Sequence, residues 1–174
     1  MQRDAFSFDS IMKLPLLKII LISGILCSTS YGLTNGSEVP IFTALDDTGS
    51  RWSFSKAVQE SAIVLFFYPA AMTGGCTKQA CGFQDDHKLW KSSGFEVIGI
   101  SGDQPKNLSL FKKAHGISYK MLSDPEGKIA DKFGVPIDKG GKIDRFIDGE
   151  KHSLHRGVTA KRWTFEISAQ GMVL

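Results

Sequence analysis

Two cysteines lie five residues apart in a segment that could carry out thiol chemistry. The segment runs Tyr68-Pro-Ala-Ala-Met-Thr-Gly-Gly-Cys-Thr-Lys-Gln-Ala-Cys81, so that Cys76 follows Thr73 and a glycine pair. A cysteine reacts as its thiolate, and the unpaired N–H groups at a helix start stabilise such an anion. We therefore predict a nucleophilic Cys76 in the first turn of a helix, with the Thr73 hydroxyl and the Gly74-Gly75 N–H groups around its sulfur. A buried structural cysteine is the alternative.

The residues around this segment alternate between strand and helix patterns. Residues 62–68 form a continuous apolar, β-branched and aromatic run, which is typical of a strand buried on both faces. A helical pattern over 77–90 and a strand at 95–100 complete a βαβ unit. The pattern of the following residues predicts a helix at 105–115, a strand at 119–122, a helix at 125–133 and a strand at 162–167. This alternation predicts an α/β fold with helices covering a central sheet.

Two other segments contain turn signals. Short alternating runs at 40–44 and 51–54 flank Asp46-Asp47-Thr48-Gly49, which predicts a small antiparallel hairpin. Residues 134–161 are rich in glycine and charge, and we interpret them as a long surface loop with a short strand near 145–147.

Cys76 follows the strand predicted at 62–68 and opens the next helix. It would therefore lie at the carboxyl edge of the sheet, where sites in open α/β folds usually occur.

Composition restricts the class of protein. The 174 residues are 42% hydrophobic and 22% charged, which is ordinary for a globular domain and unlike disordered, fibrous or multi-span membrane proteins. The net charge of +3 is too small to indicate binding to nucleic acid, and we expect none. Three cysteines are too few for a disulfide scaffold, so their positions matter more than their number.

Residues 1–32 have the pattern of a leader, and residues 33–174 that of a single domain. The apolar run 19–27 follows two lysines and precedes Ser28-Thr29-Ser30, small residues that a signal peptidase accepts. The run is short for a membrane span. We predict cleavage and export to a periplasm, the exterior or an organelle lumen, with no stable membrane association afterwards. Without cleavage the protein would be cytoplasmic or membrane-anchored.

The spacing Pro69-x-x-x-Thr73-x-x-Cys76 resembles the active-site motif of the peroxiredoxins, the AhpC/TSA family. The second cysteine, Cys81, is similar to that of the peroxiredoxin Q or bacterioferritin comigratory protein branch, and the likeness runs from about Gly36 to the end of the chain. It implies a thioredoxin-like α/β fold, with a central mixed sheet flanked by helices and an N-terminal β-hairpin. It also implies a thiol peroxidase for hydrogen peroxide and organic hydroperoxides that needs no cofactor and no metal.

The resemblance also assigns roles to residues. Cys76 would be the peroxidatic cysteine, which forms a sulfenic acid, and Cys81 the resolving one, which captures it as an intramolecular disulfide. Pro69, Thr73 and Arg162 would complete the site. Arg162 is chosen because residues 162–167 look like the family's late strand, which begins with the catalytic arginine, and Arg156 is the alternative. A thioredoxin-type dithiol would reduce the disulfide, and the branch resembles monomers more often than rings.

The proposed disulfide conflicts with an intact helix. Residues five apart on an α-helix are separated by about 7.5 Å along the axis and roughly 140° around it. Bridged cysteines need Cα atoms about 4.4 to 6.8 Å apart. If Cys76 and Cys81 form a disulfide, the first turns of their helix must unwind.

The chain departs from the family pattern at three places. Gly74 stands where the family often has proline, which loosens the loop, and Gln79 stands where it often has glutamate, which removes a charge. Relatives also continue through another strand and a terminal helix, whereas only 12 residues follow Arg162 here. We therefore expect a truncated or differently built C-terminal layer.

Two other classes of protein share the expected fold. A thioredoxin-like disulfide oxidoreductase normally has Cys-x-x-Cys, whereas the spacing here is Cys-x-x-x-x-Cys. A copper-binding assembly protein could use Cys76, Cys81 and a histidine such as His152 or His155, because thiolates and imidazole suit copper. That family separates its cysteines by three residues, which again differs from this chain.

Overall fold

The computed structural model describes residues 32–174. The predicted leader, residues 1–32, therefore lies almost entirely outside the described residues, and its cleavage stays a prediction. Within residues 32–174 no helix is long and apolar enough to cross a membrane.

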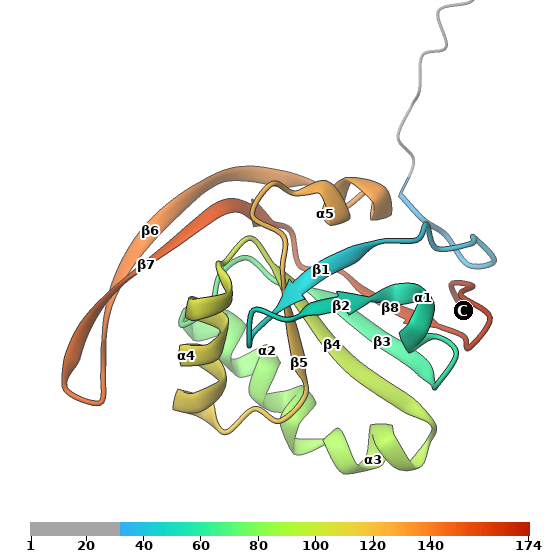
Figure 1. Cartoon of the computed structure of the whole chain (residues 1–174), viewed down its shortest axis with the longest axis horizontal. Helices are drawn as coiled ribbons and strands as arrows, with labels where there is room; N and C mark the ends of the chain where they lie inside the picture. The colour runs from blue at the N-terminus through green and yellow to red at the C-terminus, as the bar shows by residue number, and fades with distance from the viewer. Residues whose placement is uncertain (1–31) are drawn as a thin grey trace, which may run out of the picture.

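Six strands form a central mixed sheet in the order β2-β1-β5-β4-β3-β8 (Figure 1). The strands are β1 (Thr43–Asp46), β2 (Arg51–Ser53), β3 (Ala62–Phe67), β4 (Phe95–Ser101), β5 (Lys120–Ser123) and β8 (Thr164–Ile167). The three inner strands β3, β4 and β5 are parallel, whereas β8 runs antiparallel to β3 and β1 antiparallel to β5. The prediction of an α/β fold with a central mixed sheet is confirmed.

Helices cover both faces of the sheet. They are α1 (Phe54–Ala57), α2 (Gly74–Asp85), α3 (His87–Ser92), α4 (Pro105–His115) and α5 (Lys128–Phe133). The helix predicted over 77–90 is two helices, since the backbone leaves helical geometry at Asp86. The helix predicted at 105–115 is confirmed: Pro105 occupies its first turn and Gly116 ends it with a φ of 63°. Proline suits a helix start and glycine suits a left-handed cap.

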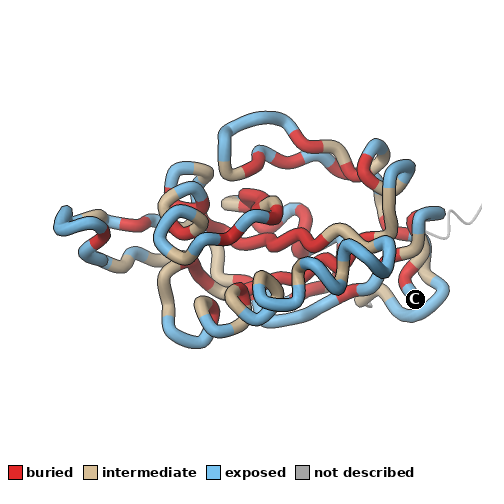
Figure 2. Tube along the Cα trace, turned by 90° about the horizontal axis from the view of Figure 1, so that it is seen from below, coloured by how far each residue is buried: buried red, intermediate tan, exposed pale blue. Residues whose placement is uncertain are grey.

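Strand β3 lies at the centre of two hydrophobic clusters. Its residues Ile63, Leu65 and Phe67 pack on one side, against α1 and α5. Val64 and Phe66, with Tyr68 beyond the strand end, pack on the other side, against α2 and α4. Figure 2 shows the buried residues concentrated in this central layer. Burial on both faces explains the unbroken apolar run, and it fixes the strand end from which the cysteine loop departs.

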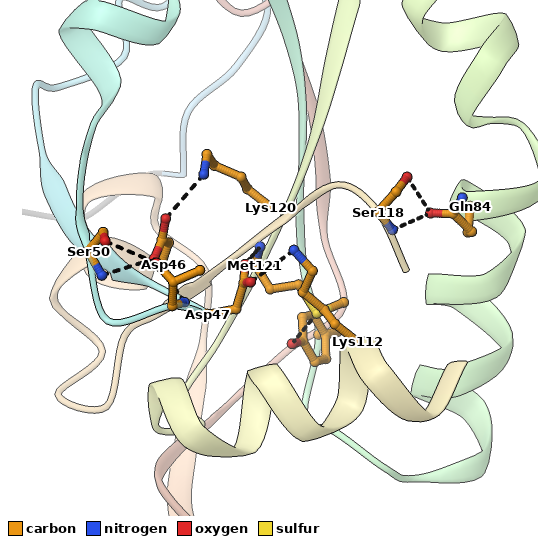
Figure 3. A network of polar contacts seen from close by, with 10 residues as sticks. Asp46, Asp47, Ser50, Gln84, Lys112, Ser118, Lys120 and Met121 are labelled. Atoms are coloured by element: carbon orange, nitrogen blue, oxygen red, sulfur yellow. Dashed lines mark hydrogen bonds and ion pairs between the residues drawn. The ribbon is translucent and has the colours of Figure 1, made fainter. Parts of the chain in front are cut away.

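The predicted N-terminal hairpin is present as β1 and β2, and ion pairs attach it to neighbouring elements. Asp46 lies 3.1 Å from Lys120 of β5, and Asp47 lies 2.9 Å from Lys112 of α4 (Figure 3). Burial acts to raise the pKa of Asp46, but hydrogen bonds from Thr48, Lys120 and Ser50 outweigh it and lower that pKa. The hairpin therefore closes one edge of the sheet, and both of its carboxylates are paired with lysines of neighbouring elements.

Residues 134–161 are not the long loop that the sequence predicts. They form two long antiparallel strands, β6 (Ile137–Ile147) and β7 (Glu150–Ala160), which extend past α4 as a curved arm (Figure 1). The short strand expected near 145–147 is the end of β6. The projecting end of this arm is mostly exposed (Figure 2).

Glycines in the hairpin and in the loop after β4 allow two backbone segments to lie very close together. A Cβ on Gly157 would lie 2.0 Å from the Pro125 carbonyl oxygen, and one on Gly102 would lie 2.1 Å from that of Val158. Their contact is a hydrogen bond from the Gly157 N–H to the Gly102 carbonyl, 3.0 Å long. The absence of side chains therefore lets the β6–β7 hairpin pack against the loop that follows β4.

Candidate active site

The segment after β3 carries Cys76 into the first turn of α2. Thr73 is the extended residue that precedes the helix, and it makes no side-chain bond to the helix N–H groups. The first N–H groups of a helix have no intrahelical partners, so they can stabilise an anion at this position. The Cys76 side chain is 2% exposed and belongs to the cluster between β3, α2 and α4. Only a small reacting group could reach its sulfur while the loop keeps this conformation.

Arg162 lies against Cys76 although 86 residues separate them in the sequence. Its Nη2 is 3.5 Å from the Cys76 Sγ, and its Nη1 donates a hydrogen bond to the Gln79 side-chain oxygen. The pairing of β8 with β3, extended by a 2.8 Å bond from the Phe67 N–H to the Trp163 carbonyl, brings Arg162 to this edge. A permanently charged guanidinium is therefore positioned to stabilise a thiolate.

The alternative arginine, Arg156, lies on β7 and bonds elsewhere. Its Nε donates to the Thr159 hydroxyl over 2.9 Å, within the β6–β7 hairpin. The structure brings Arg162, and not Arg156, into contact with the Cys76 sulfur.

Pro69 and Thr73 shape the loop before the cysteine. Pro69 is half-buried and follows Tyr68, whose N–H bonds the Ile100 carbonyl at 3.0 Å. The Thr73 hydroxyl donates to the Ala70 carbonyl at 3.0 Å, which closes the loop on itself. The fixed φ of proline and this bond both restrict the conformation that the loop can adopt.

Cys81 lies on the same continuous helix as Cys76, and both thiols are free. The part of α2 that carries Cys81 is anchored. The buried Tyr119 hydroxyl donates to the Ala80 carbonyl at 2.9 Å, and the Gln84 side chain accepts the Ser118 N–H at 2.7 Å (Figure 3). The structure thus places the two cysteines on one helix without joining them.

The model of the AhpC/TSA family matches residues 35–174. This chain belongs to the AhpC/TSA family. Curated relatives include chloroplastic peroxiredoxin Q of Populus jackii, 41% identical over 111 residues, which are 64% of this chain and 52% of that protein. The Triticum aestivum protein of that name is 41% identical over 121 residues, 70% of this chain and 54% of its own length. The chain spans about half the length of these relatives.

Solved structures give the same assignment for this AhpC/TSA-family chain. Peroxidoxin BcpB from Mycobacterium tuberculosis has a TM-score of 0.67 at 35% identity, covering 82% of this chain and 83% of that one. The bacterioferritin comigratory protein of Xanthomonas campestris has a TM-score of 0.60 at 22% identity, covering 76% and 77%. The second likeness concerns the fold alone. Together with the curated relatives, these findings confirm the thioredoxin-like fold and the peroxiredoxin Q/bacterioferritin comigratory protein branch.

Asp103 is a residue of this site that the sequence reasoning missed. Its Oδ2 accepts the Ala71 N–H at 2.7 Å and the Ser101 hydroxyl at 3.0 Å. Burial raises the pKa of Asp103, against the opposing effect of these hydrogen bonds. Asp103 therefore holds the cysteine loop from the neighbouring strand. Its position just after β4, at the carboxyl edge of the sheet, is the signal that could have identified it.

Arg145 is a second missed contact to the same loop. Its Nε donates to the Met72 carbonyl at 2.9 Å, and Met72 has a φ of 59°, in the left-handed region that non-glycine residues rarely adopt. This contact does not follow from a sequence pattern that predicts a loop at 134–161. It depends on the pairing of β6 with β7, which brings Arg145 back to the cysteine loop.

A cavity of about 540 Å³ lies beside the start of α2 in this AhpC/TSA-family chain. Three elements line it. They are the cysteine loop and first turns of α2 (Met72, Gly74, Thr77), the end of α4 (Ala114, His115) and the end of the β6–β7 hairpin (residues 145–148). Another cavity, of about 620 Å³, lies at the opposite end of the sheet, near Glu60, Glu96 and His87, and no residue of the cysteine loop or of α2 lines it. The first cavity is therefore the one that lies next to the segment carrying Cys76.

The copper-binding alternative has no structural support. Within residues 32–174 no three His, Cys, Asp or Glu side chains come together as a group that could hold a metal ion. His152 and His155 are on β7. The structure therefore does not join either histidine with the two cysteines as a set of metal ligands.

Proposed function

We propose that this chain is a thiol peroxidase whose reacting atom is the sulfur of Cys76. The observation that carries the proposal is the 3.5 Å contact between the Arg162 guanidinium and Cys76 at the start of α2. A peroxide bond is broken by a thiolate with donors placed for the charge that develops on the leaving oxygen. The guanidinium and the first N–H groups of α2 supply both requirements.

In the first step the Cys76 thiolate attacks one oxygen of the hydroperoxide. A sulfur–oxygen bond forms, the oxygen–oxygen bond breaks, and the leaving oxygen takes a proton to depart as water or an alcohol. The sulfur is oxidised to a sulfenic acid. Arg162 stabilises the thiolate and the leaving oxygen, while Pro69 and Thr73 keep the loop in position.

Hydrogen peroxide and organic hydroperoxides are the proposed substrates. The low exposure of Cys76 favours a small reacting group. The cavity of about 540 Å³ beside Gly74 and Thr77 leaves room for an organic substituent, with the apolar side chains of Met72 and Phe146 on its wall. Phe146 is 77% exposed, so this wall is open to solvent.

In the second step the Cys81 thiol attacks the Cys76 sulfenic acid. A disulfide forms and the sulfenic oxygen leaves as water. A thioredoxin-type dithiol then reduces the disulfide by thiol–disulfide exchange. Both cysteines come from one chain, so a monomer would suffice for the cycle.

The predicted leader and the chloroplastic relatives favour action in an organelle lumen or outside the cytosol. The reductant would then be a dithiol protein of that compartment, since the redox poise differs between compartments. Measuring the mass of the protein purified from its native cells tests this part. A mass that begins near residue 33 supports it, whereas an intact N-terminus contradicts cleavage.

Mass spectrometry after one equivalent of hydrogen peroxide tests the chemistry. The parent should form a Cys76–Cys81 disulfide, and Cys81→Ser should accumulate a sulfenic acid on Cys76. Cys76→Ser should leave Cys81 a free thiol and serves as the matched control. A Cys76 that reacts no faster than a free thiol would overturn the proposed function.

A further inference from the structure

The step from sulfenic acid to disulfide requires part of α2 to unwind. Cys76 and Cys81 are on one continuous helix, on which residues five apart are too distant to be bridged. Some hydrogen bonds around α2 must therefore break before the disulfide can form. Which bonds break is set by how each end of the helix is attached.

The end of α2 that carries Cys81 is held by the interior of the protein. Tyr119 is 3% exposed, and its hydroxyl donates to the Ala80 carbonyl at 2.9 Å. Gln84, one turn further along, accepts bonds of 2.7 and 3.0 Å from the N–H and hydroxyl of Ser118 (Figure 3). Releasing this end would leave a buried polar group without a partner, which is unfavourable.

The end that carries Cys76 is held at Ala71 by the buried Asp103, but the next residue, Met72, is held by a contact that solvent can replace more readily. Arg145 is exposed, and its Nε donates to the Met72 carbonyl at 2.9 Å. Met72 has an unfavourable backbone conformation, with a φ of 59°, so the loop needs external contacts to keep it. An ion pair of 2.9 Å between Lys113 and Asp148 connects the hairpin end to α4 and so holds Arg145 near the loop.

We infer that Arg145 is a positioning residue that keeps the cysteine loop folded and thereby sets the balance between two fates of the oxidised Cys76. The inference rests on the proposed peroxidase function. While the loop stays folded, Cys76 is apart from Cys81. When the Arg145–Met72 bond opens, the first turns of α2 can unwind and Cys76 can approach Cys81.

The two fates differ in the group with which the sulfenic acid reacts. Attack by the Cys81 thiol forms the sulfur–sulfur bond and releases water. Attack by the sulfenate on a second hydroperoxide transfers one more oxygen to sulfur, giving a sulfinic acid and releasing water or an alcohol. The hydroperoxide is the oxidant in both oxidation steps. A more firmly held loop favours the second fate, because the sulfenic acid waits longer for Cys81.

Arg145→Ala is the variant that tests the inference, with Lys142→Ala as its matched control. Lys142 is an exposed basic residue of the same strand, three residues away, and faces His155 in the register of the hairpin. Arg145→Ala should raise the rate of disulfide formation relative to that of sulfenic acid formation about three- to tenfold, as loss of one hydrogen bond implies. It should also lower the fraction of sulfinic acid at excess hydrogen peroxide, measured by mass spectrometry. Lys142→Ala should match the parent.

Amide hydrogen exchange of the reduced protein separates this inference from the proposed function. Peptides that cover residues 70–78 should exchange faster in Arg145→Ala than in the parent, while those covering 80–92 stay unchanged. Unchanged exchange at 70–78, or faster exchange with an unchanged ratio of disulfide to sulfinic acid, would overturn the role of Arg145. If hydrogen peroxide does not oxidise Cys76 even in the parent, the proposed function fails, and exchange alone decides whether Arg145 holds the loop.

Discussion

Arg162 contacts both Cys76 and Gln79, which lie one turn apart on α2. Its Nη2 is 3.5 Å from the Cys76 sulfur, and its Nη1 bonds the Gln79 side-chain oxygen. A neutral Gln79 can orient the guanidinium without compensating its charge, so the positive charge remains available to the sulfur. The glutamine that departs from the family pattern thus acts as an acceptor for Arg162.

Replacing Arg162 tests how much its contacts with Cys76 and Gln79 contribute to the rate of Cys76 oxidation. Arg162→Ala should lower the rate constant of Cys76 with hydrogen peroxide by roughly 10²- to 10³-fold, the usual cost of removing one such donor. Arg162→Lys should give an intermediate rate, because lysine keeps the charge but lacks the planar fork. Stopped-flow kinetics under pseudo-first-order conditions measures these rates. Arg156→Lys is the control, and a larger loss there than in Arg162→Lys would contradict the assignment.

Gly74→Ala tests whether the first turn of α2 must unwind. A Cβ at Gly74 would meet nothing within 4 Å, so alanine should fit without strain. Alanine favours a helix over glycine by up to about 1 kcal/mol, which should slow disulfide formation about two- to fivefold without slowing sulfenic acid formation. Quenched-flow mass spectrometry separates the two steps. Gly82→Ala, also free of contacts but beyond Cys81, is the matched control; equal slowing in both variants would locate the unwinding elsewhere.

Asp103→Asn should change how stability depends on pH. Burial raises the pKa of Asp103 above its ordinary value, which is about 3.9. As the pH rises from that value, the unfolded chain loses the proton first, so this group's contribution to stability falls until the folded carboxyl has also ionised. Urea unfolding at several pH values from about 4 to 7 should show that decline in the parent and less of it in Asp103→Asn.

A neutral-pH comparison provides the control for Asp103. Asp103→Ala should cost about 1 to 3 kcal/mol of the free energy of unfolding, because the buried Ala71 N–H loses its acceptor. Asparagine keeps an acceptor oxygen and should cost less. If Asp103→Asn and the parent follow the same pH profile, the carboxyl does not titrate differently in the folded state.

Gly157→Ala should destabilise the attachment of the β6–β7 hairpin. The new Cβ would lie 2.0 Å from the Pro125 carbonyl oxygen, which is backbone and cannot swing away. Overpacking of this kind costs about 1 to 3 kcal/mol, and urea unfolding monitored by circular dichroism measures it. Gly141→Ala is the control, since its Cβ would meet only the flexible end of Arg156, at 3.2 Å. Equal stability of the two variants would show that the close approach is not required.

Local patterns in the sequence predict most of the central fold. The apolar run of β3, the proline and glycine that bound α4 and the turn before β2 are each encoded within a few residues. Helix starts and buried strands are local in this sense, because they depend on backbone conformation and on side-chain polarity at fixed spacing. The position of Cys76 in the first turn of α2 follows from the same local signals.

The β6–β7 hairpin could not be predicted in this way. Its exposed faces lack a clear apolar alternation, and glycines at 140, 141 and 157 resemble a flexible loop. The role of Gly157 depends on tertiary packing, because its backbone lies directly against Gly102 and Pro125, which belong to two other loops. The sequence shows that each of these residues is a glycine. Only the tertiary packing determines which backbone segment lies close to it.

By itself, the sequence determined the α/β alternation, the reactive-cysteine segment and the resemblance that names Arg162. Only the tertiary structure decided that Arg162 touches Cys76, that Asp103 and Arg145 hold the loop before it, and that Tyr119 anchors the far part of α2. The physical reason is the range of the interactions. Backbone propensity and periodic burial act between near neighbours, whereas the contacts that surround Cys76 join segments that only strand pairing and core packing bring together.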